Sequence, residues 1–193
     1  MNRKLTILIV AGCALLATAA ANAETPAMYW GIGFSNTAYT TRPFTDPGDP
    51  ANNVTAELES RGYALKAGID IGSWLGLEFQ YDLAKEGKDQ PYNLGNKLEI
   101  NAGSAFARFN FPFPRVNLYA LAGIGRVSID TGPQTARENH YAAGLGLDLM
   151  ASDRNMLYVE ALRYQHEDLE DNDPYMVVYT VGFKHHFEFA GVR

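Results

Sequence analysis

Apolar and polar side chains alternate along most of this chain. In the segment 175–189 the odd positions are mainly apolar or aromatic, and from Thr180 the even ones are mostly small, polar or charged. Successive side chains of a strand point to opposite faces, so the segment predicts a strand with one apolar face. Its length suits the roughly 9–11 residues with which a tilted strand crosses a bilayer. The apolar face carries Tyr179, Val181, Phe183, Phe187 and Phe189.

The same alternation recurs in seven earlier segments, which brings the expected number of strands to eight. The seven segments are 28–38, 62–72, 75–83, 97–111, 117–129, 140–149 and 156–166. The links between strands alternate strictly between long and short. The long ones are 39–61, 84–96, 130–138 and 167–174, and the short ones are 73–74, 110–116 and 150–155. This alternation is typical of an up-and-down barrel with turns at one rim and loops at the other.

Two of the strands are irregular. In 97–111 we place Ile100 and Ala102 on the apolar face, and Phe106 and Phe109 then require a bulge near residues 107–108. In 117–129 the facing is ambiguous. We place Tyr119, Leu121, Val127 and Ile129 on the apolar face, which turns Arg126 and Ser128 the other way.

Alternation alone does not say which face is outside, and a soluble barrel of lipocalin type would alternate too. The polar face is rich in glycine, which suits the crowded interior of a narrow barrel better than a soluble exterior. We therefore predict an all-β fold, an eight-stranded antiparallel up-and-down transmembrane β-barrel. Aromatic residues near strand ends fit interfacial girdles: Tyr29, Trp30, Trp74, Tyr81, Phe109, Phe111, Tyr119, Tyr141, Tyr175, Phe187 and Phe189.

The charged residues of the polar face are expected to meet inside the barrel. Isolated buried charges are costly, so a set with both signs should form a lumenal polar network. The candidates are Lys66, Asp70, Glu78, Asp82, Glu99, Arg126, Asp148, Glu160 and Lys184. We expect the network to be structural, with a narrow ion path as the alternative.

The N-terminus predicts a secretory signal. Arg3 and Lys4 precede an apolar run, and an A-x-A site ends at Ala23, so residues 1–23 are expected to be cleaved and 24–193 to form the barrel domain. Lipidation at Cys13 is the alternative. Loss of Arg3 and Lys4 takes the formal net charge from −6 to −8, which argues against nucleic acid as a partner.

Two motifs resemble small outer-membrane barrels of the OmpA/OmpX type. They are the passage FNFP followed by LYALAGIG, at 109–112 and 118–125, and the closing VGFKHHF at 181–187. The resemblance implies a porin-family β-barrel domain in the outer membrane of a Gram-negative bacterium. It also implies that the apolar face of the last strand is a terminal insertion signal, read by the outer-membrane assembly machinery.

Catalytic and metal sites find little support in the sequence. Lipid A deacylases have a catalytic His and Ser two residues apart. Here Asp168 occupies the position of that Ser relative to His166, so the nucleophile is missing. His140 and His186 are expected to hydrogen-bond in the lumen rather than bind metal, and the acidic run 167–173 could hold Ca²⁺ or Mg²⁺ weakly. We expect no catalytic residue, cofactor or metal.

The expected function is therefore non-enzymatic: membrane integrity, display of acidic loops and adhesion. The alternatives are a deacylase-like enzyme and a narrow porin. The expected partners are outer-membrane lipid, lipopolysaccharide and the assembly machinery, and we expect a monomer.

Overall fold

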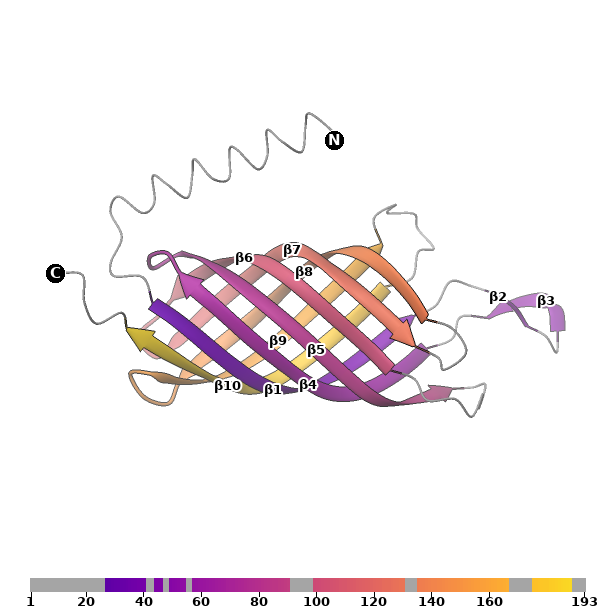
Figure 1. The fold of residues 1–193 in the computed structure, drawn as a ribbon, viewed down its shortest axis with the longest axis horizontal. Coiled ribbons are helices and arrows are strands. Elements are labelled where there is room, and N and C mark those ends of the chain that lie inside the picture. Colours follow the sequence, from indigo (N-terminus) through magenta and orange to yellow (C-terminus); the bar gives the residue numbers. More distant parts are fainter. Residues whose placement is uncertain are drawn as a thin grey trace, which may run out of the picture.

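Eight long strands close into an antiparallel barrel in the computed structural model (Figure 1). The structure describes residues 27–40, 44–46, 49–54, 57–90, 99–130, 135–166 and 175–188. The barrel strands are β1 (Ala27–Thr40), β4 (Glu57–Asp70), β5 (Leu75–Gln90), β6 (Glu99–Pro112), β7 (Val116–Asp130), β8 (Thr135–Met150), β9 (Asn155–His166) and β10 (Tyr175–Glu188). Each pairs with its neighbour in the chain, and β1 pairs with β10 to close the sheet. The predicted fold class is confirmed.

The two ends of the barrel differ. The turn end carries the connections 71–74, 113–115 and 151–154, together with the start of β1 and the end of β10 (Figure 1). The loop end carries the connections 41–56, 91–98, 131–134 and 167–174, the first of which contains the hairpin of β2 (Phe44–Asp46) and β3 (Asp49–Val54). None of the described segments forms an apolar helix of membrane-spanning length. The predicted signal at 1–23 lies outside the described residues.

Most of the strands are longer than predicted, which shortens most of the links. β8 begins at Thr135, so the expected long link 130–138 is only the four residues 131–134. This connection is no longer than the turns 71–74 and 151–154, and the predicted strict alternation of long and short links is wrong there. At about 3.3 Å per residue and a tilt near 40°, a 14-residue strand rises about 35 Å, beyond an apolar band of about 25 Å.

The outer wall of the barrel is apolar and its lumen is crowded, as the glycine-rich polar face predicted. Phe34, Ile124 and Leu145 point outward and are 68%, 63% and 69% exposed. A soluble barrel would not leave such a surface uncovered, so the lipocalin alternative is wrong. Glycine is required where a tyrosine crosses the lumen, since a Cβ at Gly68 would meet Tyr29 at 2.3 Å and one at Gly146 would meet Tyr119 at 2.1 Å.

The predicted facing of β6 is wrong. β6 pairs with β5 and β7 without any register shift, so the expected bulge near residues 107–108 does not form. Its even positions point inward throughout, which places Ile100, Ala102 and Phe106 in the lumen. The bulge was expected so that Phe106 could share a face with Phe109, whereas Phe106 packs inside the lumen.

The predicted facing of β7 is wrong as well. Tyr119, Leu121 and Val127 are each no more than 2% exposed and fill the lumen. Tyr29 also points inward, so it and Tyr119 do not belong to an aromatic girdle. Trp30, Trp74, Phe111 and Phe187 do lie on the outer surface near the turn end, as predicted.

Candidate functional site

Six charged side chains from six strands fill the lumen toward the turn end. Three are cations and three are carboxylates, so the cluster as a whole is neutral, and no member is more than 4% exposed. We call this group the charge cluster: Lys66 of β4, Glu78 of β5, Arg108 of β6, Asp148 of β8, Glu160 of β9 and Lys184 of β10.

Glu78 is the centre of the charge cluster. Its carboxylate accepts from Arg108 Nη1 at 2.8 Å and from Lys66 Nζ at 3.2 Å, and it lies 3.8 Å from Lys184 Nζ. Lys66 also reaches Glu160 at 2.5 Å. Asp148 closes the circuit, because it accepts from Arg108 and, at 2.9 Å, from Lys184. Each charge of the cluster therefore has an opposite partner, which is the condition for burying charges at acceptable cost.

Three tyrosines line the charge cluster. Tyr29 donates to Glu78 at 2.6 Å and Tyr119 donates to Glu160 at 2.9 Å. The Arg108 guanidinium lies 3.7 Å from the centre of the Tyr119 ring, and Lys66 Nζ lies 4.5 Å from that of Tyr158. A cation is attracted to the face of an aromatic ring, so this stacking stabilises the buried guanidinium and ammonium groups without adding charge to the lumen. At this level the lumen is filled by side chains that are linked by ion pairs, hydrogen bonds and cation–π contacts.

A second polar group closes the mouth of the lumen at the turn end. Asn110 donates to Asp70 at 3.0 Å, and Asn117 donates to Asn110 at 2.9 Å. His186 Nε2 lies 3.5 Å from Asp70. Asp70 and His186 are only partly buried, so this group meets solvent.

Asp82 lies apart from the charge cluster. It is 2% exposed, and its carboxylate accepts from Gln80 at 3.3 Å and from Tyr164 at 3.5 Å. Tyr164 OH also lies 2.9 Å from Ser104 Oγ. Among the described residues no cation comes within 4.0 Å of Asp82, so hydrogen bonds from Gln80 and Tyr164 stabilise its carboxyl group in place of an ion pair.

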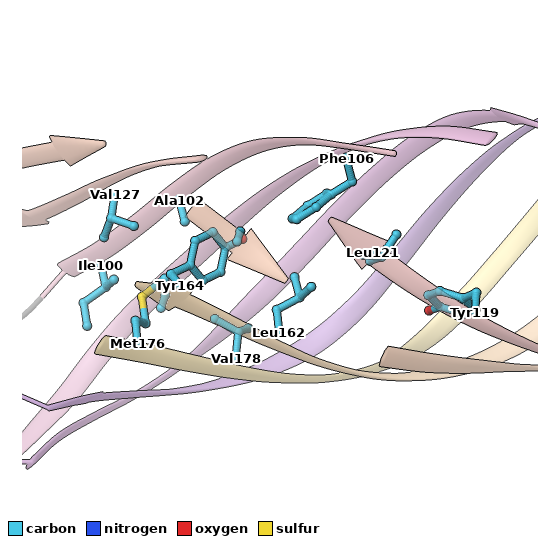
Figure 2. Packing of buried hydrophobic residues seen from close by; sticks show 12 residues of the cluster. Ile100, Ala102, Phe106, Tyr119, Leu121, Val127, Leu162, Tyr164, Met176 and Val178 are labelled. Carbon is cyan, nitrogen blue, oxygen red and sulfur yellow. The ribbon is translucent and has the colours of Figure 1, made fainter. Parts of the chain in front are cut away.

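Toward the loop end most of the large side chains in the lumen are apolar, although buried polar residues such as Thr37, Ser60 and His140 lie there too. Figure 2 shows Ile100, Val127, Tyr164, Met176 and Val178 gathered between the strands, with Leu162 beside them. Each is no more than 2% exposed. We call these six residues the apolar plug. Together with the charge cluster it fills the interior along most of its length, and it was not predicted, because the sequence argument reserved the lumen for small and polar residues.

The predicted lumenal residues fall into three groups. Lys66, Glu78, Asp148, Glu160 and Lys184 lie in the charge cluster, and Asp82 and Asp70 lie in the smaller polar groups. Glu99 lies on the outward phase of β6, opposite Asp130, so its predicted lumenal position is wrong. Arg126 is exposed on the outer wall, so its predicted lumenal position is wrong. The odd positions of β7 hold the lumen-filling Tyr119, Leu121 and Val127, and the even ones must therefore point outward.

Arg108 is the member of the charge cluster that sequence reasoning missed. It donates to Glu78, Asp148 and Asn110. Because a bulge was expected at residues 107–108, Arg108 was not assigned to the lumen. A regular strand would have placed Arg108 and Asn110 inside and the aromatic Phe109 and Phe111 outside. The glycines of β7 also indicated the correct facing. Gly123 and Gly125 suit the crowded lumenal face, and Arg126, which alternates with them, must then point outward.

The other candidates are placed as follows. His140 is buried near the loop end and His186 lies at the turn end, so they do not share a site. The described residues contain no group of three side chains suited to a metal ion. The acidic run 167–173, with Asp168, lies outside the described residues, as does the side chain of His166. On β10, Tyr179, Val181 and Phe187 are exposed on the outer wall and Phe183 is partly so, while Phe189 lies outside the description.

Comparison with known proteins agrees with this architecture. The family model described as "Outer membrane protein beta-barrel domain" matches residues 6–187. The fold and this match define an outer-membrane barrel. The chain belongs to that family, and its location is the outer membrane. No curated protein matches the chain.

Several crystal structures share the fold at low sequence identity. Ail, the attachment invasion locus protein of Yersinia pestis, in complex with the heparin analogue sucrose octasulfate, is 15% identical with a TM-score of 0.58, covering 85% of this chain and 100% of that one. OprG of Pseudomonas aeruginosa is 11% identical with a TM-score of 0.58, covering 86% and 98%. Neisserial surface protein A is 13% identical with a TM-score of 0.56, covering 82% and 97%.

Proposed function

We propose that this protein is a closed, non-catalytic barrel that strengthens the outer membrane and presents its loops to the exterior. The filled lumen carries the proposal. The charge cluster is neutral and tied across six strands, and the apolar plug lies between it and the loop end. An ion would have to displace paired charges and then pass the closely packed apolar plug, both of which are costly. A porin-like role is therefore disfavoured.

Conductance tests the closed lumen. Purified barrel inserted into planar bilayers should give no steady single-channel current, and Lys66→Ala should leave the bilayer silent or noisy without a defined unitary step. Arg126→Ala is the matched control, since that side chain lies outside the lumen. A defined unitary current that changes with Lys66→Ala would favour the porin instead.

The loops are proposed to bind a basic partner. The link 167–174 contains five carboxylates, Glu167, Asp168, Glu170, Asp171 and Asp173, and no cation. Ail was crystallised with a polysulfated heparin analogue, but an acidic loop would repel such a ligand. Surface attachment by this chain should accordingly favour basic proteins and weaken with salt.

Attachment of whole cells tests this part. Cells displaying the wild type should adhere to a surface coated with a basic protein more strongly than cells in which these five carboxylates are replaced by amides. Asp46→Asn with Asp49→Asn, in the β2–β3 hairpin, is the control and should adhere normally. Equal adhesion of all three strains would contradict the adhesion role. Loss of lipid A acyl chains dependent on His166 would favour the deacylase-like enzyme.

A further inference from the structure

Two grooves on the outer wall of the barrel share one construction. The first, of about 550 Å³, runs over β5 to β8, with Gly103 and Ala105 among its lining residues and Phe79, Ile124 and Tyr141 at its sides. The second, of about 710 Å³, runs over β8, β9, β10 and β1. Its apolar lining is Phe34, Leu145, Leu147, Val159, Ala161, Tyr179 and Val181.

Each groove has an arginine paired with an asparagine at its loop-end side. In the first groove Arg126 of β7 lies opposite Asn139 of β8, and in the second Arg61 of β4 lies opposite Asn36 of β1. All four side chains are exposed on the outer wall.

The next outward pair toward the turn end is apolar in both grooves. In the first groove it is Ile124 opposite Tyr141, and at the second it is Phe34 of the lining opposite Tyr63, which lies beside the groove. The rings of Tyr63 and Phe34 are 5.3 Å apart. An Arg–Asn pair followed by an apolar pair with at least one aromatic ring thus occurs twice, on separate parts of the wall.

The two arginines lie at similar distances from the turn end. Eight positions separate Arg126 from the outward Leu118 near the turn end, and eight separate Arg61 from Ile69. At about 2.5 Å of vertical rise per tilted residue this is about 20 Å. An apolar band is about 25 Å tall. With the apolar band beginning at Leu118 and Ile69, both guanidinium groups lie where hydrocarbon meets head groups, in the leaflet of the loop end.

Within the part of the chain that the structure describes, no carboxylate forms an ion pair with either guanidinium. Arginine binds phosphate through two parallel hydrogen bonds, and the neighbouring asparagine amide adds further donors. An exposed arginine at this depth is best stabilised by an anion, and the groove beside it is shaped for an apolar chain. The two features together match an acylated lipid with a phosphate group.

We propose that each groove binds one molecule of lipopolysaccharide through its lipid A part, with an acyl chain in the groove and a phosphate on the Arg–Asn pair. Lipopolysaccharide is the phosphorylated lipid of the outer leaflet, and the loop end faces that leaflet. The inference depends on the outer-membrane location and is independent of the loop-mediated attachment proposed above.

Native mass spectrometry of the purified barrel with added diphosphorylated lipid A tests the inference. The wild type should saturate at two lipids, Arg61→Ala and Arg126→Ala at one each, and the double variant should bind at least about 10-fold more weakly. Arg163→Ala is the matched control. That side chain is also exposed on the outer wall, but it stacks at 4.7 Å on Tyr175 and lines neither groove, so two lipids should remain.

A second variant tests the groove separately from the charge. A Cβ at Gly103 would meet Tyr81 at an ordinary 3.5 Å, so Gly103→Leu should fold, fill the first groove and remove one lipid while Arg126 remains. A heat-modifiable gel band verifies folding of every variant. Full binding by the double variant, or equal binding of dephosphorylated lipid A or of phosphatidylglycerol, would overturn the proposal.

Discussion

Removing Arg108 is the sharpest test of the lumenal network. The change Arg108→Met keeps most of the side-chain volume but deletes the cation that bridges Glu78 and Asp148. It also removes the hydrogen bond to Asn110 at 2.8 Å and the stacking on Tyr119. Three carboxylates would then face two lysines inside the barrel. Breaking a buried pair in this way costs about 3–5 kcal/mol, and we expect the free energy of unfolding to fall by that amount.

The assay is guanidinium unfolding of the barrel from phospholipid vesicles without lipid A, extrapolated to zero denaturant. The two tryptophans, Trp30 and Trp74, are exposed on the outer wall, so their fluorescence reports loss of contact with lipid. Arg126→Met is the matched control. It removes the same charge from an exposed position and should change the free energy by no more than about 0.5 kcal/mol.

A compensating change separates charge imbalance from lost packing. In Arg108→Met with Asp148→Asn, two lysines face Glu78 and Glu160, and the charge cluster is neutral again. We expect this pair to recover at least about 1 kcal/mol relative to Arg108→Met alone, as coupled neighbours do. If Arg108→Met were no more destabilising than Arg126→Met, the charge cluster would not stabilise the fold, and the reasoning would fail.

Three further perturbations test other parts of the lumen by the same unfolding assay. Gly146→Val should lower the free energy of unfolding by at least about 1–3 kcal/mol, because its Cβ would meet the Tyr119 ring at 2.1 Å. Gly103→Ala is the control and should be near neutral, because its Cβ would lie 3.5 Å from Tyr81. Equal effects of the two changes would contradict the close approach of Tyr119 to Gly146. Ile100→Ala in the apolar plug should cost about 2–5 kcal/mol, and a change below about 1 kcal/mol would show that the plug is loosely packed. Tyr164→Phe removes the hydroxyl contacts with Ser104 and Asp82 and should lower the free energy of unfolding by about 1 kcal/mol. An unchanged free energy would mean that Asp82 finds another hydrogen-bond donor.

The alternating pattern was enough to predict the barrel and the facing of most of its strands. A side chain's face follows from its position in a strand, and glycine on one face with aromatic residues on the other indicated which face is crowded. Six strands follow this rule, including β8, where His140 and Asp148 are buried and Tyr141 and Leu145 exposed, and β10, where Lys184 is buried and Val181 exposed. The sequence therefore placed five of the six members of the charge cluster.

The tertiary structure decided the facing of β6 and β7, for which the alternation gave the wrong answer because both of their faces carry apolar residues. The lumen has room for the side chains of Ile100, Phe106 and Val127. That room depends on the size of the residues they pack with on distant strands, such as Leu162 and Val178. The same packing turns Arg108 inward to the carboxylates of β5 and β8 and leaves Arg126 on the outer wall. Alternation fixes which residues share a face, but the volume available inside the closed barrel fixes which face is inside.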